Sequence, residues 1–267
     1  MPLSLLAIVS ALLYLVAAGI QLMHVLQRRR GLGLGVILSG SVALLCHAAV
    51  AWQSVVDTSS VHLGFYKIAA LIFFIINLAC IVFLLKRPLQ NLLLALLPLS
   101  AAAVLVSAFA PETGRASGPL QDGLLLHVSA SLLAYALLTL AALQAALLAV
   151  QDRQLKHHHP TGIVRLLPPL QLMESMLFEL LWAGVVVLGA AIVSGFLFVE
   201  NIFAQHLVHK TILTIIAWVI YGVLLWGHHQ LGWRSQTAVR LTLVAFVLLV
   251  LAFFGSKLVL ELVLQRP

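Results

Sequence analysis

Long apolar runs separated by short polar segments dominate the chain. Each run approaches the roughly 20 residues that a membrane-spanning helix needs. Alternation of polar and apolar residues at period two, which is typical of a transmembrane barrel, is absent. Because backbone groups in lipid must satisfy one another, each run predicts a helix. The eight runs cover Leu3–Leu26, Gly31–Trp52, Phe65–Leu85, Asn91–Ala110, Gly123–Val150, Met173–Val199, Thr211–Gln230 and Leu241–Leu262.

Composition supports this pattern and narrows the class of protein. Of the 267 residues, 63% are hydrophobic and 9% are charged, whereas soluble domains average roughly 45–50% apolar and about 25% charged. So few charges cannot cover a water-facing surface, and so much apolar surface is incompatible with disorder. We therefore expect an all-α fold: a polytopic membrane helical bundle of about eight transmembrane helices, forming one integral-membrane domain over residues 1–267.

The distribution of Lys and Arg predicts the orientation. Basic residues accumulate in cytoplasmic loops, and ten of the fifteen lie in alternate connections, after the first, third, fifth and seventh runs. This bias predicts that both termini lie outside and that the protein is a multi-pass protein of a bacterial inner (cytoplasmic) membrane. It also accounts for the net charge of +7 without a nucleic-acid partner. The ten residues are Arg28, Arg29, Arg30, Lys86, Arg87, Arg153, Lys156, Arg165, Arg234 and Arg240.

Motifs for bond-making chemistry are missing from the sequence. No paired carboxylates occur within a run, and no Walker, Gly-x-Ser-x-Gly or Gly-x-Gly-x-x-Gly context is present, so we expect no enzymatic activity. Cys46 and Cys80 lie at different depths, which argues against a disulfide between them. Because no Cys-x-x-Cys-His occurs, covalent attachment of haem to this chain is not indicated.

Histidine is the unusual residue, with 11 copies in so apolar a chain. Ionisable groups inside spans are candidates for function. At about 1.5 Å per residue, His47 lies roughly 8 Å and His127 roughly 6 Å from the outer ends of their runs. His24 and His228 lie near inner ends, with His229 next in sequence. An outer pair and an inner pair of histidines are therefore expected.

Two interpretations of the outer pair stay open. A neutral imidazole is a good ligand for haem iron, so His47 and His127 are predicted to hold one iron, with Ser129 or Ser131 fixing the tautomer. Alternatively, each histidine bonds a hydroxyl or carbonyl across a helix interface. The run His157-His158-His159 is more typical of a solvated loop, while His206 and His209 are either propionate partners or interfacial residues.

From the fifth run onward, short motifs occur in a characteristic order. Together they resemble the cytochrome c assembly family of membrane proteins, which includes CcsA. The resemblance covers about residues 123–262, and Cys46-His47-Ala48 and Trp226-Gly227-His228 are similar to small eight-span members. The motifs are Leu126-His127-Val128-Ser129 with Leu132–Leu138, Val193-Ser194-Gly195 with Glu200-Asn201, Lys210 with Trp218 and Tyr221, Gly232-Trp233-Arg234, and Phe253-Phe254-Gly255.

The resemblance implies a haem-related role. His127 stands where the family has its first outer haem histidine, and His228 lies near an expected membrane-embedded histidine. Between Glu200 and Lys210 the family's Trp-rich outer loop is absent, with Phe203 as the aromatic residue there. The resemblance therefore implies binding and handling of haem b rather than a complete haem-attaching synthetase.

The leading functional prediction is an inner-membrane haem-binding protein that assists cytochrome c assembly. His127 and His47 would be metal ligands at the outer leaflet, Lys210 would pair with a propionate, and His228 would belong to a second, inner site. Expected partners are haem, cytochrome assembly components and the lipid bilayer. The alternatives are a small-solute transporter and a structural accessory subunit of another membrane protein.

Overall fold

The structure is a computed structural model of the chain. It describes residues 3–27, 32–55, 61–62, 64–85, 90–111, 116–117, 122–156, 164, 167–199 and 208–255. The chain divides into two compact units, which are described separately. Unit 1 comprises residues 1–120 with 265–267, and unit 2 comprises residues 121–264.

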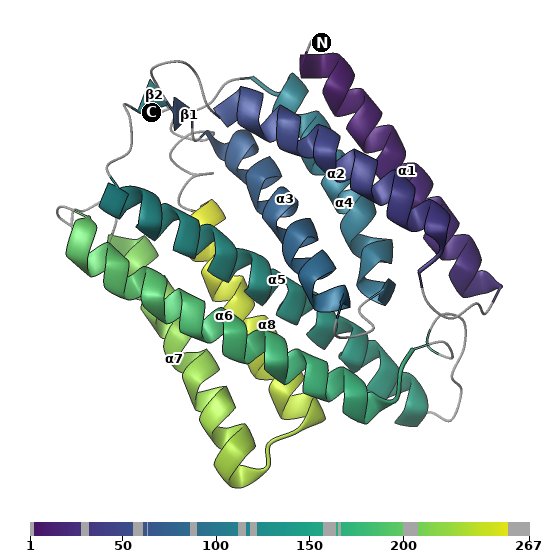
Figure 1. Cartoon of the computed structure of the whole chain (residues 1–267). Coiled ribbons are helices and arrows are strands. Elements are labelled where there is room, and N and C mark those ends of the chain that lie inside the picture. The colour runs from purple at the N-terminus through teal and green to yellow at the C-terminus, as the bar shows by residue number, and fades with distance from the viewer. Residues whose placement is uncertain are drawn as a thin grey trace. The chain divides into compact units, whose positions relative to one another are not determined.

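Unit 1 is a set of four helices in chain order. Helix α1 packs on α2 and α4, while α3 packs on the other sides of α2 and α4, so that the four helices close a ring (Figure 1). A short 3₁₀ turn leads into α4. The elements are α1 (Leu3–Leu26), α2 (Leu34–Val55), β1 (Val61–His62), α3 (Phe65–Leu84), η1 (Gln90–Leu92), α4 (Leu93–Phe109) and β2 (Ala116–Ser117).

Small side chains and buried hydroxyls let the helices of unit 1 approach closely. Ala7 and Ala11 are buried on α1, and between them Ser10 Oγ donates to the Ala43 carbonyl of α2 at 2.9 Å. Asn77 Nδ2 of α3 donates to Ser100 Oγ of α4 at 2.6 Å. Such interhelical bonds contribute about 0.6 kcal/mol each in membrane proteins. Their main effect is therefore to specify the register of the helices, and their contribution to the stability of the fold is small.

A two-residue strand pair joins two connections of unit 1. Val61 of β1 pairs with Ser117 of β2, and His62 pairs with Ala116, in antiparallel register. Strand β1 follows α2 and β2 follows α4, so these connections emerge at the same end of unit 1. Helices α3 and α4 lie between the two connections in sequence, and two crossings return the chain to the side from which it started. The strand pair therefore agrees with the predicted crossing pattern.

Unit 2 repeats the ring arrangement with the remaining four helices. Helix α5 packs on α6 and α8, and α7 packs on α6 and α8. The starts of α5 and α7 and the ends of α6 and α8 therefore meet at one end of the unit. The elements are α5 (Asp122–Lys156), α6 (Leu170–Phe198), α7 (Val208–Leu231), α8 (Ser235–Val250) and a π-helical turn, η3 (Leu251–Gly255).

The α5–α6 interface is the tightest in unit 2. A Cβ atom at Gly184 of α6 would lie 2.7 Å from Leu138 Cδ2 of α5, so a larger residue would have to displace the Leu138 side chain. Further along, Gln144 Nε2 of α5 donates to the Met173 carbonyl at 3.0 Å. A pair of helices fixed this closely provides a rigid base for side chains at its ends.

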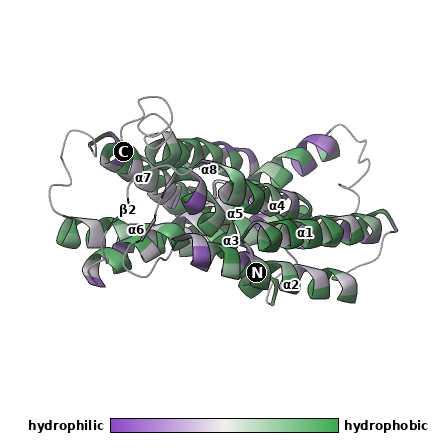
Figure 2. Ribbon diagram, turned by 90° about the horizontal axis from the view of Figure 1, so that it is seen from above, coloured by the Kyte–Doolittle hydropathy of each residue, from purple (hydrophilic) through white to green (hydrophobic). Residues whose placement is uncertain are grey.

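The helices carry apolar side chains on their outer faces as well as inside. Leu45, Trp182 and Leu197 are among many large apolar residues that are more than half exposed, and Figure 2 shows hydrophobic colour over most of each helix. Within the described part of the chain, eight helices are long and apolar enough to cross a membrane. The predicted all-α polytopic bundle is confirmed, while the orientation of its termini stays a prediction.

Candidate functional site

A pocket of about 160 Å³ opens in unit 2, at the end that the basic-residue pattern places outside. Its lining comes from all four helices and from the π turn. The walls are largely apolar, and one imidazole, one ammonium and several hydroxyls are set among them. The lining residues are His127, Ser131, Tyr135, Leu188, Ala191, Ile192, Gly195, Phe196, Val199, Lys210, Thr211, Thr214, Ile215, Leu249 and Phe253.

The His127 ring is anchored through one nitrogen to α6. Its Nδ1 lies 2.9 Å from the Ala191 carbonyl oxygen and 3.3 Å from Ser194 Oγ. The Ser194 hydroxyl itself donates to the same carbonyl at 2.9 Å. Because a carbonyl only accepts, Nδ1 must carry the proton and donate. In the neutral ring, Nε2 then keeps its lone pair, which is the form that binds a metal.

Gly195 provides the space that this ring occupies. A Cβ atom at position 195 would lie 2.9 Å from His127 Cε1 and 3.2 Å from Nδ1. The imidazole therefore rests directly on the α6 backbone. Ser194 and Gly195 are adjacent, so one motif supplies both the hydroxyl beside the ring and the surface beneath it.

Lys210 lies in the same pocket as His127. Its Nζ sits over the ring of Phe253, 4.8 Å from the ring centroid, and is close enough to His127 to interact with it electrostatically. Phe253 belongs to the π turn η3, and π turns within helices occur frequently at functional sites. The turn thus places an aromatic face beneath the ammonium group.

Deeper in the pocket, Tyr135 is packed among aromatic rings. Its ring lies 5.7 Å from Phe253 and 5.8 Å from Phe254, measured between centroids. The hydroxyl of Tyr135, and that of Tyr221 on α7, are buried without a hydrogen-bond partner in the described part of the chain. An unpaired buried hydroxyl costs stability. These two hydroxyls could therefore each form a further hydrogen bond below the pocket.

The donor set fits one-sided coordination of haem iron. His127 offers an oriented Nε2, Lys210 offers a cation for a carboxylate, and the remaining wall is apolar and aromatic. The cavity is smaller than the roughly 300 Å³ at which ligand pockets usually begin, so it would enclose part of a macrocycle. Among the described residues, no group of three His, Cys, Asp or Glu side chains could hold a bare metal ion.

His47 occupies a different setting, in the core of unit 1. The residue is completely buried, its Nδ1 lies 3.2 Å from the Tyr14 hydroxyl of α1, and its ring packs edge-on against Phe74 of α3. The Ala70 carbonyl is near the ring, yet Nε2 forms no well-directed hydrogen bond within the described residues. The His127 pocket is lined by unit 2 alone, so the pairing of the two histidines on one iron stays a prediction.

His228 lies at the opposite end of α7 from Lys210, roughly 27 Å away at about 1.5 Å per residue. Its Nδ1 lies 2.8 Å from the Trp233 carbonyl, to which it donates, and its ring stacks on Phe178 with centroids 3.4 Å apart. These contacts hold the chain where it turns from α7 to α8. The structure thus separates His228 from the His127 pocket, and its assignment to a second, inner site stays a prediction.

Other histidines lie away from both of these settings. His24 packs against Gly33, which begins the approach to α2, whereas His209 and His229 are exposed on α7. The loop histidines His157, His158, His159 and His206 lie outside the described residues. Cys46 and Cys80 are both free, which confirms the expectation that they form no disulfide.

Sequence reasoning missed the residues that orient His127. Ser129 is exposed, and the bonds to Nδ1 come from α6 rather than from Ser129 or Ser131. The expectation that a neighbouring serine of α5 fixes this nitrogen is therefore wrong. A signal was available, because Val193-Ser194-Gly195 was one of the recognised motifs, but nothing in its spacing indicated contact with His127.

The arrangement defines a multi-pass membrane protein with a histidine-bearing pocket at one end of a four-helix unit. Comparison with protein families identifies the family to which the chain belongs. A model described as Cytochrome C assembly protein matches residues 36–264, so the chain belongs to the cytochrome c assembly family. The match extends into unit 1, beyond the region about 123–262 over which motifs were recognised.

Curated relatives agree with this assignment. The chain is 33% identical over 265 residues to Inner membrane protein YpjD of Escherichia coli (strain K12), covering 96% of this chain and 99% of the relative. It is 26% identical over 170 residues to Protein HemX of Brevibacillus brevis, covering 61% and 62%. No solved structure matches significantly. The predicted likeness to small eight-span members and the inner-membrane, multi-pass location are confirmed.

Proposed function

We propose that this protein binds haem b in the unit 2 pocket and positions it during cytochrome c assembly, with no bond-making of its own. The observation that carries the proposal is the anchoring of His127 Nδ1 to the Ala191 carbonyl, which leaves Nε2 as the free ligand atom. Membership of the cytochrome c assembly family supports the cofactor and the process. Haem, when bound, supplies an iron that accepts an axial nitrogen.

Each residue of the pocket has a distinct task in this proposal. His127 donates its Nε2 lone pair, and the Ala191 carbonyl keeps the ring in that tautomer. Lys210 pairs with a propionate by a charge-assisted hydrogen bond, while the Phe253 face holds its ammonium group in place. The apolar side chains that α6 contributes to the pocket would limit the access of water to the iron. That His47 is a second ligand, and that His228 belongs to an inner site, stay predictions from the sequence.

The small-solute transporter remains a weaker alternative. Discontinuous helices would support it, but α4 runs unbroken through Pro98, its internal proline. A structural accessory subunit would need no pocket with an oriented imidazole. We therefore argue haem binding alone.

A haem titration of the purified full-length protein tests the proposal. The wild type is expected to bind haem stoichiometrically and to show a Soret band. His127→Ala is expected to weaken haem binding by at least ten- to hundredfold, which is the loss typical when a residue that only supports a metal ligand is replaced. His229→Ala, an exposed histidine outside the pocket, is the matched control and should leave binding unchanged. Equal binding by all three proteins would reject the site, and no binding by the wild type would reject the function.

A further inference from the structure

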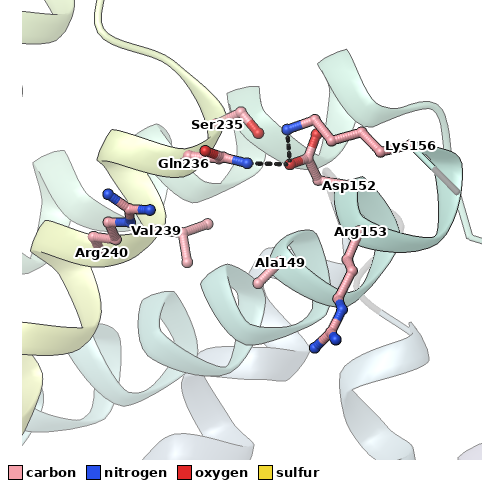
Figure 3. A pocket seen from close by; sticks show the side chains of 8 residues that line it. All are labelled: Ala149, Asp152, Arg153, Lys156, Ser235, Gln236, Val239 and Arg240. Atoms are coloured by element: carbon pink, nitrogen blue, oxygen red, sulfur yellow. Dashed lines mark hydrogen bonds and ion pairs between the residues drawn. The ribbon is translucent and has the colours of Figure 1, made fainter.

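A second pocket lies at the other end of unit 2, between α5 and α8. It has a volume of about 340 Å³ and is lined by Ala149, Asp152, Arg153, Lys156, Ser235, Gln236, Val239 and Arg240. Ala149 and Val239 face each other between the helices, and the charged side chains lie around them (Figure 3). The pocket is thus an apolar hollow with a charged rim.

The rim has a surplus of positive charge. Three cations, Arg153, Lys156 and Arg240, surround a single acid, Asp152. The Asp152 carboxylate already accepts from Lys156 Nζ at 2.7 Å and from Gln236 Nε2 at 3.4 Å. In Figure 3 the Arg153 side chain extends away from this carboxylate, and the Arg240 guanidinium lies on the opposite side of the pocket. Neither arginine forms an ion pair with a described residue, so two positive charges remain uncompensated.

The surface below the rim is apolar and faces outward. On α8, Arg240 begins a face that continues through Val244, Val247 and Leu251 at helical spacing, and all three apolar side chains are about half exposed. On α5, Val150 is similarly exposed one turn before Arg153. A cationic rim above an outward apolar strip has the two-part chemistry of a phospholipid, with a phosphate at the rim and an acyl chain along the strip.

We propose that this pocket between α5 and α8 is a binding site for an anionic phospholipid, whose phosphate is attracted by the cations Arg153 and Arg240 on its rim. Guanidinium groups match phosphate oxygens by paired hydrogen bonds. The basic-residue pattern places this end at the cytoplasmic surface, where anionic headgroups are found. The site is separate from the His127 pocket, so it stands or falls independently of haem binding.

The test is retention of lipid by the full-length protein in detergent, measured by native mass spectrometry and by thermal unfolding during titration with phosphatidylglycerol or phosphatidylcholine. Wild-type protein should retain phosphatidylglycerol and be stabilised by it, but not by phosphatidylcholine. Arg153→Gln and Arg240→Gln should each weaken phosphatidylglycerol binding about fivefold, which corresponds to about 1 kcal/mol per cation near a membrane surface. Asp152→Asn should strengthen binding, because it removes the one negative charge of the rim.

Arg234→Gln is the matched control, because Arg234 is an exposed cation at the same end that does not line the pocket. It should weaken binding much less than Arg240→Gln. Equal losses at positions 234, 153 and 240 would show general attraction to a cationic surface and overturn the site. Equal stabilisation by phosphatidylcholine, or by inorganic phosphate without lipid, would also overturn it, since either result removes the need for an anionic lipid.

Discussion

Gly195 of α6 and His127 of α5 touch across the helix interface, because a methyl group at position 195 would lie 2.9 Å from the imidazole Cε1. The contact joins two motifs that stand 68 positions apart in sequence. It also explains why the ring is held in one place: Gly195 borders its Cε1 edge, while the Ala191 carbonyl accepts from its Nδ1. Position 195 therefore limits the orientation of the proposed ligand ring.

Gly195→Ala is expected to displace the His127 ring and weaken haem binding by about ten- to hundredfold, as for other residues that orient a metal ligand. Because the clash falls on a side chain that can rotate, the helix should still form, and the thermal midpoint should change little. Gly222→Ala on α7 is the control, since no atom lies within 4 Å of the added methyl group. Haem affinity and unfolding temperature are measured for both. Wild-type affinity in Gly195→Ala would contradict the proposed role of the contact.

Lys210→Met keeps the length and apolar stem of the side chain but removes its charge. We expect haem affinity to fall about tenfold, the cost of a charge-assisted hydrogen bond, while stability stays within about 0.5 kcal/mol. Lys210→Arg should retain most of the affinity. Lys67→Met, which removes a cation from the start of α3 in unit 1, should leave the titration unchanged. If Lys210→Met titrates like the wild type, Lys210 has no part in propionate binding.

Substitution of His47 tests whether this residue binds the iron or only packs between helices, the two interpretations that the sequence left open. Because the ring is completely buried in unit 1, His47→Ala should lower the free energy of unfolding by about 2–4 kcal/mol, as for other large core truncations. Tyr14→Phe, which removes only the hydroxyl beside Nδ1, should cost about 0.6 kcal/mol. A haem spectrum that changes from six- to five-coordinate in His47→Ala would place His47 on the iron. An unchanged spectrum would assign it to the packing of α1, α2 and α3.

Orientation is tested with reporter fusions. Fusions after Arg30, Arg87, Arg165 or Arg234 should report the cytoplasm, and fusions after Asp57, Arg115 or Pro267 should report the periplasm, because the basic residues favour the cytoplasmic side. Alkaline phosphatase and green fluorescent protein activities give opposite readouts at each point. A cytoplasmic signal at Pro267 would be incompatible with eight crossings that begin outside.

The number and type of the helices followed from hydropathy alone, because lipid leaves the backbone few other options. The boundaries did not. Helix α5 continues six residues beyond the predicted end at Val150, since Gln151 Nε2 finds the Pro168 carbonyl at 2.8 Å and the charged last turn bears its own Asp152–Lys156 bridge. The apolar run ends where polar residues begin, whereas the helix ends where its backbone hydrogen bonds end.

The candidate site could be predicted only in part for a similar reason. Depth along a helix placed His127 near one end, and the family motifs singled out Lys210, but depth does not fix the face that a residue presents. His47 has a similar predicted depth and lies in a closed core. The Ala191 carbonyl is a backbone group, so its role cannot be predicted from the type of side chain. The π turn that carries Phe253 does not alter the hydrophobic pattern, so it could not be predicted either.

The central claim is that His127 Nε2 is the iron ligand, and chemical rescue measures this directly. In His127→Gly the Soret band of the haem complex should be lost or shifted, and millimolar imidazole should restore it by filling the vacated position. His229→Gly should retain the wild-type spectrum and show no imidazole-dependent recovery. The account predicts loss with rescue at position 127 alone. An unaltered Soret band and affinity in His127→Gly without imidazole would contradict it.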